Sequence, residues 1–117
     1  MDIGSTYFTF RVSRTLQDEF DAFCNEKGIP SSVAIKLFIN RVINGERLNI
    51  KFGSFSKNYG SADSKVGLTI NALMLKQFTD YTKTRYGIGR SLLIREFMQS
   101  CVALGDFPFD AYDVYPD

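Results

Sequence analysis

The sequence contains one pattern twice, namely a short stretch of alternating polar and apolar residues followed by two stretches with helical apolar periodicity. Equivalent apolar positions lie 58 residues apart, as Phe20 and Phe78 do. Beyond the first helical stretch the offset becomes 59, as for Gly28 and Gly87, so we place one inserted residue in the second inter-helix turn. A repeat that keeps strand, helix, turn and helix in step constrains the fold more than any single motif.

Each copy has only about 40 residues, which is too few for a lone unit to bury a stable core. We therefore predict one domain over residues 1–117, in which the two copies complete each other's core. The predicted fold class is mainly α-helical with one two-stranded antiparallel ribbon, and the two copies form an intramolecular pseudo-dimer. The parts of the domain are copy one (7–43), a connector (44–64), copy two (65–103) and an acidic aromatic tail (104–117).

The alternation in the two predicted strands assigns a side to each residue. Six apolar side chains are expected to face the helices: Phe8, Phe10, Val12, Val66, Leu68 and Ile70. Six others are expected to face outward: Tyr7, Thr9, Arg11, Lys65, Gly67 and Thr69. A two-stranded ribbon fits the major groove of B-DNA, where outward side chains can reach base edges.

Helix boundaries are marked in both copies. Ser13 and Asn71 follow the strands, where a side-chain oxygen can cap the first amides of a helix. Gly28 and Gly87 can end the first helices. A serine also stands near the start of each second helix, about residue 32 and about residue 91, in a position to cap it.

Several function classes are disfavoured by composition. The chain has no His, which excludes His-dependent catalytic triads and zinc sites. The segment Gly87-Ile88-Gly89 lacks the further glycine and the preceding strand of a dinucleotide site. Cys24 and Cys101 fall on helical core positions and are interpreted as buried thiols, with a disulfide or a metal site as the alternative. We therefore expect no enzyme activity, no cofactor and no metal.

Charge and hydropathy also bear on partners and location. No apolar run approaches the roughly 18 residues of a membrane span, and the first residues lack a secretory pattern, so we expect a cytoplasmic protein without membrane contact. The net charge is +1, but the last twelve residues hold four Asp and no Lys or Arg. The body is therefore moderately basic, which permits nucleic-acid binding.

In the connector, the aromatic residues Phe52, Phe55 and Tyr59 suggest packing against the body, and residues 47–52 alternate like a short extra strand.

The residues Phe8-Thr9-Phe10-Arg11-Val12-Ser13, followed by an amphipathic helix, a glycine turn and a serine at the next helix start, resemble the ribbon-helix-helix DNA-binding proteins such as the Arc and MetJ repressors. Copy one, continuing into residues 48–52, looks like antitoxins of the RelB/DinJ type. Two such units in one chain resemble the TraY proteins of conjugative plasmids. The resemblance covers roughly residues 7–43 and 65–103 and is closer in copy one.

The resemblance implies sequence-specific binding of double-stranded DNA by a small transcriptional regulator or a DNA-marking protein, encoded by a prokaryote, plasmid or phage. It assigns base contacts to six outward residues: Tyr7, Thr9, Arg11, Lys65, Gly67 and Thr69. Arg11 is suited to guanine, and the threonines can bond a base or contact a thymine methyl. Because Gly67 has no side chain, copy two is expected to contribute less sequence information and the DNA site to be asymmetric. Solvated residues on an exposed sheet are the alternative reading of this face.

The resemblance also implies a phosphate at the start of each second helix, held by Ser31, Ser32, Arg90 and Ser91. Plain capping is the alternative for the serines. Four further basic residues are predicted to lie on solvated faces of helices: Lys36, Arg41, Lys83 and Arg95.

An alternative interpretation is a protein-interaction module with weak or no DNA binding. Such a module would be antitoxin-like, or part of a relaxosome or phage complex. It would bind its partner through the connector or the acidic tail. Further copies of the chain side by side on DNA are a third kind of partner.

Overall fold

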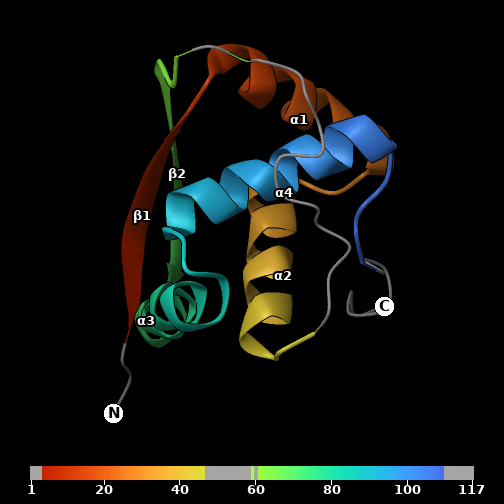
Figure 1. The fold of residues 1–117 in the computed structure, drawn as a ribbon. Helices are drawn as coiled ribbons and strands as arrows, with labels where there is room; N and C mark the ends of the chain where they lie inside the picture. The colour runs from red at the N-terminus through yellow and green to blue at the C-terminus, as the bar shows by residue number, and fades with distance from the viewer. Residues whose placement is uncertain (1–3, 47–58, 60, 110–117) are drawn as a thin grey trace.

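A computed structural model describes residues 4–46, 59 and 61–109 of the chain (Figure 1). Its elements, in order, are β1 (Ser5–Val12), α1 (Arg14–Lys27), α2 (Ser31–Ile43), β2 (Ser64–Asn71), α3 (Ala72–Tyr81), the π-helical turn η1 (Thr82–Tyr86) and α4 (Arg90–Leu104). The strands form one two-stranded sheet. The prediction of a mainly helical chain with a two-stranded antiparallel ribbon is therefore confirmed.

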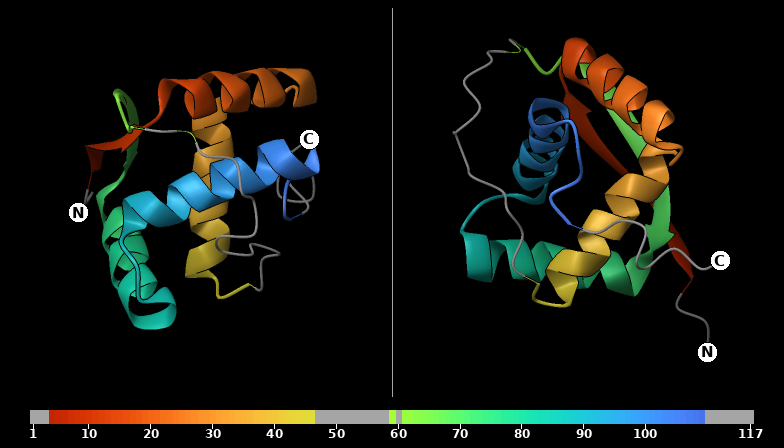
Figure 2. Two further views of the ribbon diagram at one scale, coloured as in Figure 1. Left: turned by 45° about the horizontal axis from the view of Figure 1, so that its top comes forward. Right: turned by 90° about the vertical axis from the view of Figure 1, so that its right-hand side faces the viewer.

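The two strands pair antiparallel, with Thr9 opposite Gly67 and Arg11 opposite Lys65. Burial alternates along both strands, which confirms the predicted faces. On the inner face Val66 is half-buried, and the buried residues are Phe8, Phe10, Val12, Leu68 and Ile70. The four helices cover this inner face and leave the other face open (Figure 2).

The first helix of each copy begins and ends where the sequence predicts. The side chains of Ser13 and Asn71 accept hydrogen bonds from the backbone amides three residues further on, at 3.0 and 3.1 Å. Gly28 and Gly87 follow the helical residues with φ of 77° and 68°. This left-handed conformation favours glycine because it has no Cβ.

The predicted serine caps of the second helices are wrong. Pro30 and Gly89 occupy the capping positions, with extended ψ angles of 142° and 153°, and α2 and α4 begin directly after them. Ser31, Ser32 and Ser91 consequently lie inside the first helical turn. Neither helix start has a side-chain cap among the described residues.

The inserted residue of copy two lies in η1, before Gly87, and not in the loop that follows. Cys24 and Thr82 still lie 58 positions apart, whereas Gly28 and Gly87 lie 59 apart. Within this interval the Gly87 amide donates to the Thr82 carbonyl, five residues earlier. A π-helical turn accommodates one extra residue in this way and lets the helix end at the same glycine.

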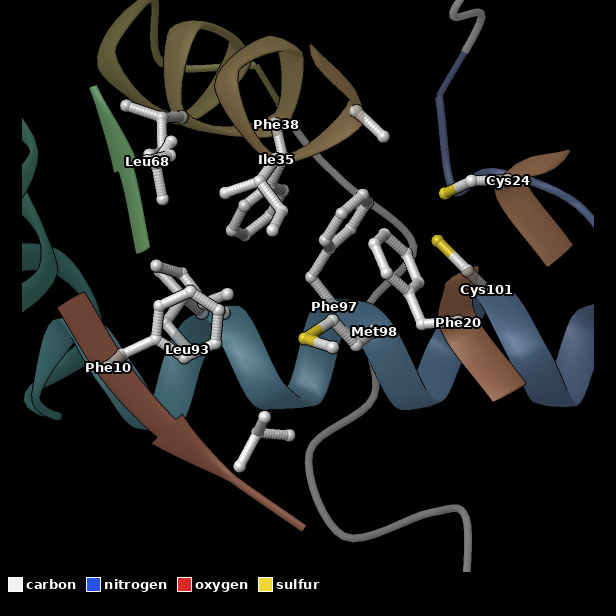
Figure 3. Packing of buried hydrophobic residues seen from close by; sticks show 14 of the residues in the cluster. Phe10, Phe20, Cys24, Ile35, Phe38, Leu68, Leu93, Phe97, Met98 and Cys101 are labelled. Carbon is white, nitrogen blue, oxygen red and sulfur yellow. The ribbon is translucent and has the colours of Figure 1, made fainter. Parts of the chain in front are cut away.

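The core joins the two copies through their helices. Helix α1 packs against α4, and α2 packs against α3. Phe38 and Phe97, 59 positions apart, stack with ring centroids 4.3 Å apart at the centre of the core (Figure 3). Phe20 meets Phe97 edge to face at 5.8 Å, and Phe78 meets Phe38 in the same way at 6.2 Å. Equivalent rings of the two copies thus make equivalent contacts.

Parts of the connector and tail pack on this body. The Tyr59 hydroxyl donates to the Glu19 carboxylate at 2.8 Å, as expected for a packed connector. Burial, followed by this bond, raises the pKa of Tyr59 to about 12. Phe107 is buried against Phe23, with ring centroids 4.9 Å apart. The predicted extra strand at residues 47–52 lies outside the described residues, as do Phe55 and the end of the tail from residue 110.

Candidate nucleic-acid interface

The outward face of the ribbon gathers all six residues predicted to contact bases. Because side chains alternate along a strand, one register places them on the same side. They form three facing pairs: Tyr7 with Thr69, Thr9 with Gly67, and Arg11 with Lys65. All six residues are exposed.

Two cations lie directly opposite each other at one end of this face. Arg11 and Lys65 are register partners, and like charges in that position destabilise a sheet. Within the described part of the chain, neither side chain forms an ion pair. This end of the ribbon therefore presents two cations without ion-pair partners to solvent, while the Asp63 carboxylate lies just before β2 and accepts a hydrogen bond from the Arg14 amide.

Arg95 brings a third cation to the same end. Its guanidinium, on α4, donates to the backbone carbonyl of Arg11 at 2.9 Å. The sequence predicted that Arg95 lies on a solvated helix face and did not predict this contact. No local pattern could have revealed it, because the two residues are 84 positions apart.

Tyr7 lies across the ribbon. Its side chain is 70% exposed, yet its phenol occupies the space above Gly67 on the other strand. A Cβ at position 67 would lie 3.0 Å from Cε2 of Tyr7 and closer still to Cζ and the hydroxyl. No described residue forms a hydrogen bond with the Tyr7 hydroxyl.

The starts of α2 and α4 differ in the charges around them. Both present first-turn amides without a side-chain cap among the described residues, and the helix dipole favours an anion there. Ser32 is exposed, whereas Ser31 and Ser91 are half-buried. The start of α2 borders an open hollow of about 490 Å³ whose lining includes Asp21. That carboxylate opposes an anion at α2.

Arg90, the first residue of α4, is held by the body of the protein. Its guanidinium lies 4.7 Å from the centroid of the Phe8 ring and donates to the Thr79 hydroxyl at 2.9 Å. The residue is half-buried. A guanidinium has five N–H donors, so one bond leaves others for an anion at the helix start. The structure thus places Arg90 at the predicted position but anchors it beneath the ribbon.

The two cysteines are free and buried, as the sequence predicts. Burial, with a smaller contribution from Asp21, raises the pKa of Cys24 to about 12. Burial and then the neighbouring Cys24 raise the pKa of Cys101 further. Their sulfur atoms face each other between α1 and α4 (Figure 3). Both thiols are protonated at neutral pH and are poor nucleophiles in this state.

In the described ranges, no helix has the length and apolar character needed to cross a membrane. The same residues contain no group of three side chains suited to hold a metal ion. A comparison of the chain with protein-family models, curated proteins and solved structures found no match.

Proposed function

We propose that this protein binds double-stranded DNA by laying the ribbon in the major groove, as a small transcriptional regulator or a plasmid or phage DNA-marking protein. The observation that carries the proposal is the facing pair of Arg11 and Lys65 on an exposed sheet face. Their mutual repulsion is a cost that an anionic partner offsets. The proposal involves no reaction and no cofactor.

The shape of the face supports the same partner. The major groove admits a two-stranded ribbon, so the outward side chains would reach base edges. Arg11 can donate two bonds to guanine, whereas Thr9 and Thr69 can bond a base or contact a thymine methyl. We propose phosphate contacts at both uncapped helix starts. Arg90 and Ser91 form the one in α4. Ser31 and Ser32 form the one in α2, which is the weaker because the Asp21 carboxylate opposes an anion there.

We further propose a tandem ribbon-helix-helix arrangement, in which the chain folds as a pseudo-dimer. Thr9 and Gly67 are equivalent positions of the repeat and are also register partners, as expected beside a local two-fold axis. The same operation exchanges the helix pair α1 and α4 with the pair α3 and α2. It also exchanges Phe38 with Phe97, which stack on each other.

A second candidate function is a protein-interaction module. Arg90 is engaged with Phe8 and Thr79, so it does not project freely toward a phosphate. Helix α1 carries four carboxylates, which favour a basic protein partner over DNA on that side: Asp18, Glu19, Asp21 and Glu26. In this candidate the connector or the tail would add to the contact.

DNA titrations of three alanine variants test the proposal. Arg11→Ala removes a base contact and is expected to abolish most of the preference for a selected site over a scrambled duplex, by roughly 1–3 kcal/mol. Arg90→Ala removes a phosphate contact and is expected to weaken both duplexes alike. Lys83→Ala is the control, because it removes one exposed positive charge in η1, which follows the end of α3 remote from β2. It is expected to change neither affinity by more than a small factor.

Measurements at two salt concentrations add a second criterion. Each phosphate neutralised by the protein contributes about −0.9 to the slope of log affinity against log salt. Thermal melts of the variants verify that Arg90→Ala is folded, because this substitution also removes the contact of the guanidinium with Phe8. A parent protein that binds no duplex at low salt would exclude the DNA function and leave the interaction module as the explanation.

A further inference from the structure

Gly67 occupies the middle of the exposed face, where a missing side chain would leave a gap. The structure fills this gap from the other strand. The register partner of Tyr7 is Thr69, but the phenol of Tyr7 reaches diagonally to the next outward position of β2, above Gly67. Diagonal neighbours on one sheet face are within reach of an aromatic side chain.

This placement depends on glycine at position 67. A Cβ there would overlap the Tyr7 phenol, so any other residue would push the ring away from the centre of the ribbon. The backbone of Gly67 shows no positive φ, so no turn or strain accounts for a glycine in this strand. The close approach of Tyr7 is the feature that uses it.

The Tyr7 hydroxyl is available to a partner. The ring is 70% exposed, and no described residue bonds its hydroxyl. A phenol can donate one hydrogen bond and accept another, so it can interact with donors and acceptors on base edges.

We infer that Tyr7 determines specificity at the centre of the DNA site, where its hydroxyl replaces the absent side chain of Gly67 on the second strand. This inference rests on the proposed DNA-binding function. In the middle of the ribbon, a single group would then contact the bases. This group is the Tyr7 hydroxyl, which comes from β1 and lies over β2. The central base pairs are consequently read in one orientation only.

A double-mutant cycle with Tyr7→Phe and Gly67→Ala tests the inference. Tyr7→Phe removes only the hydroxyl, and Gly67→Ala keeps the hydroxyl but displaces the ring. Each change is expected to reduce the preference for a selected site over a duplex altered at its central base pairs by roughly two- to tenfold, the worth of one hydrogen bond. The double variant is expected to lose no more site preference than the single variant with the larger loss, because both changes remove the same contact. Ser5→Ala, at the exposed end of β1, is the control and is expected to leave the preference unchanged.

An NMR measurement on the free protein tests the packing without DNA. Nuclear Overhauser effects between the Tyr7 ring and the Gly67 α protons are expected in the parent and are expected to weaken in Gly67→Ala at the remaining α proton. Their absence from the parent would overturn the inference whatever the DNA results are. If these effects are present and the parent selects a site, additive losses or unchanged preferences would overturn the reading role of Tyr7 alone. If the parent binds no duplex, the proposed function and this inference both fail.

Discussion

Truncation of Phe97 to alanine is expected to destabilise the protein more than any change on the exposed face. The side chain is fully buried and contacts three other rings. Its centroid lies 4.3 Å from that of Phe38 and 5.8 Å from those of Phe20 and Phe109. Phe→Ala in a core costs about 3–5 kcal/mol, and the loss of three ring contacts places Phe97 in the upper part of that range.

Urea unfolding measures this loss directly. With a slope of about 2 kcal/mol per molar urea, a loss of about 4 kcal/mol lowers the midpoint by about 2 M. Leu92→Ala is the control on the same helix, because this side chain is 41% exposed and is expected to change stability by about 0.5 kcal/mol at most. If Phe97→Ala does not fold, Phe97→Leu keeps much of the apolar volume but loses the ring contacts, and it is expected to cost about 2 kcal/mol, less than the alanine variant. A cost for Phe97→Ala below about 1 kcal/mol, or equal costs at the two positions, would refute the assigned faces of α4.

Three further outcomes are expected. Phe10→Ala is expected to cost about 3–5 kcal/mol in thermal melts and Thr9→Ala about 0.5 kcal/mol at most, and the reverse order would mean that the strand register is shifted by one residue. Because the folded pKa of Cys24 lies near 12 and its ordinary value is 9.0, the unfolded thiol ionises first, so the free energy of unfolding is expected to fall as the pH rises from about 9 toward 12. Denaturation at a series of alkaline pH values measures this change. If the free energy of unfolding of a double alanine variant of Cys24 and Cys101 fell as steeply with pH as that of the parent, the pH dependence would not come from the thiols. Gly87→Ala is expected to lose about 1 kcal/mol or more in urea unfolding because φ is 68° there, and an unchanged midpoint would argue against the left-handed conformation.

The sequence predicted best the features that depend on near neighbours. The strand faces follow from a period of two, and the caps at Ser13 and Asn71 reach amides only three residues away. The starts of the second helices were mispredicted because Pro30 and Gly89 adopt extended backbone without a side-chain cap, and a serine nearby carries no signal that excludes this.

Features set by tertiary packing were not predictable in this way. Arg41 was expected on a solvated helix face, but it is buried, pairs with Glu46 at 2.7 Å and lies 5.4 Å from the Phe109 ring centroid. Both neighbours come from beyond the end of α2. The position of Tyr7 over Gly67 likewise requires the exact pairing of two strands whose residues lie some 60 positions apart in the sequence.

The pairing of β1 with β2 inside one chain makes closure of the ribbon a unimolecular step. Two separate chains would have to meet, and dilution would drive them apart. A covalent tether instead holds its ends at an effective concentration of roughly millimolar, so the two halves need only a weak mutual affinity. A strand-interior glycine and two opposed cations each weaken a sheet, and this tether lets the chain tolerate them. Because both strands belong to one chain, dilution by itself does not separate β1 from β2.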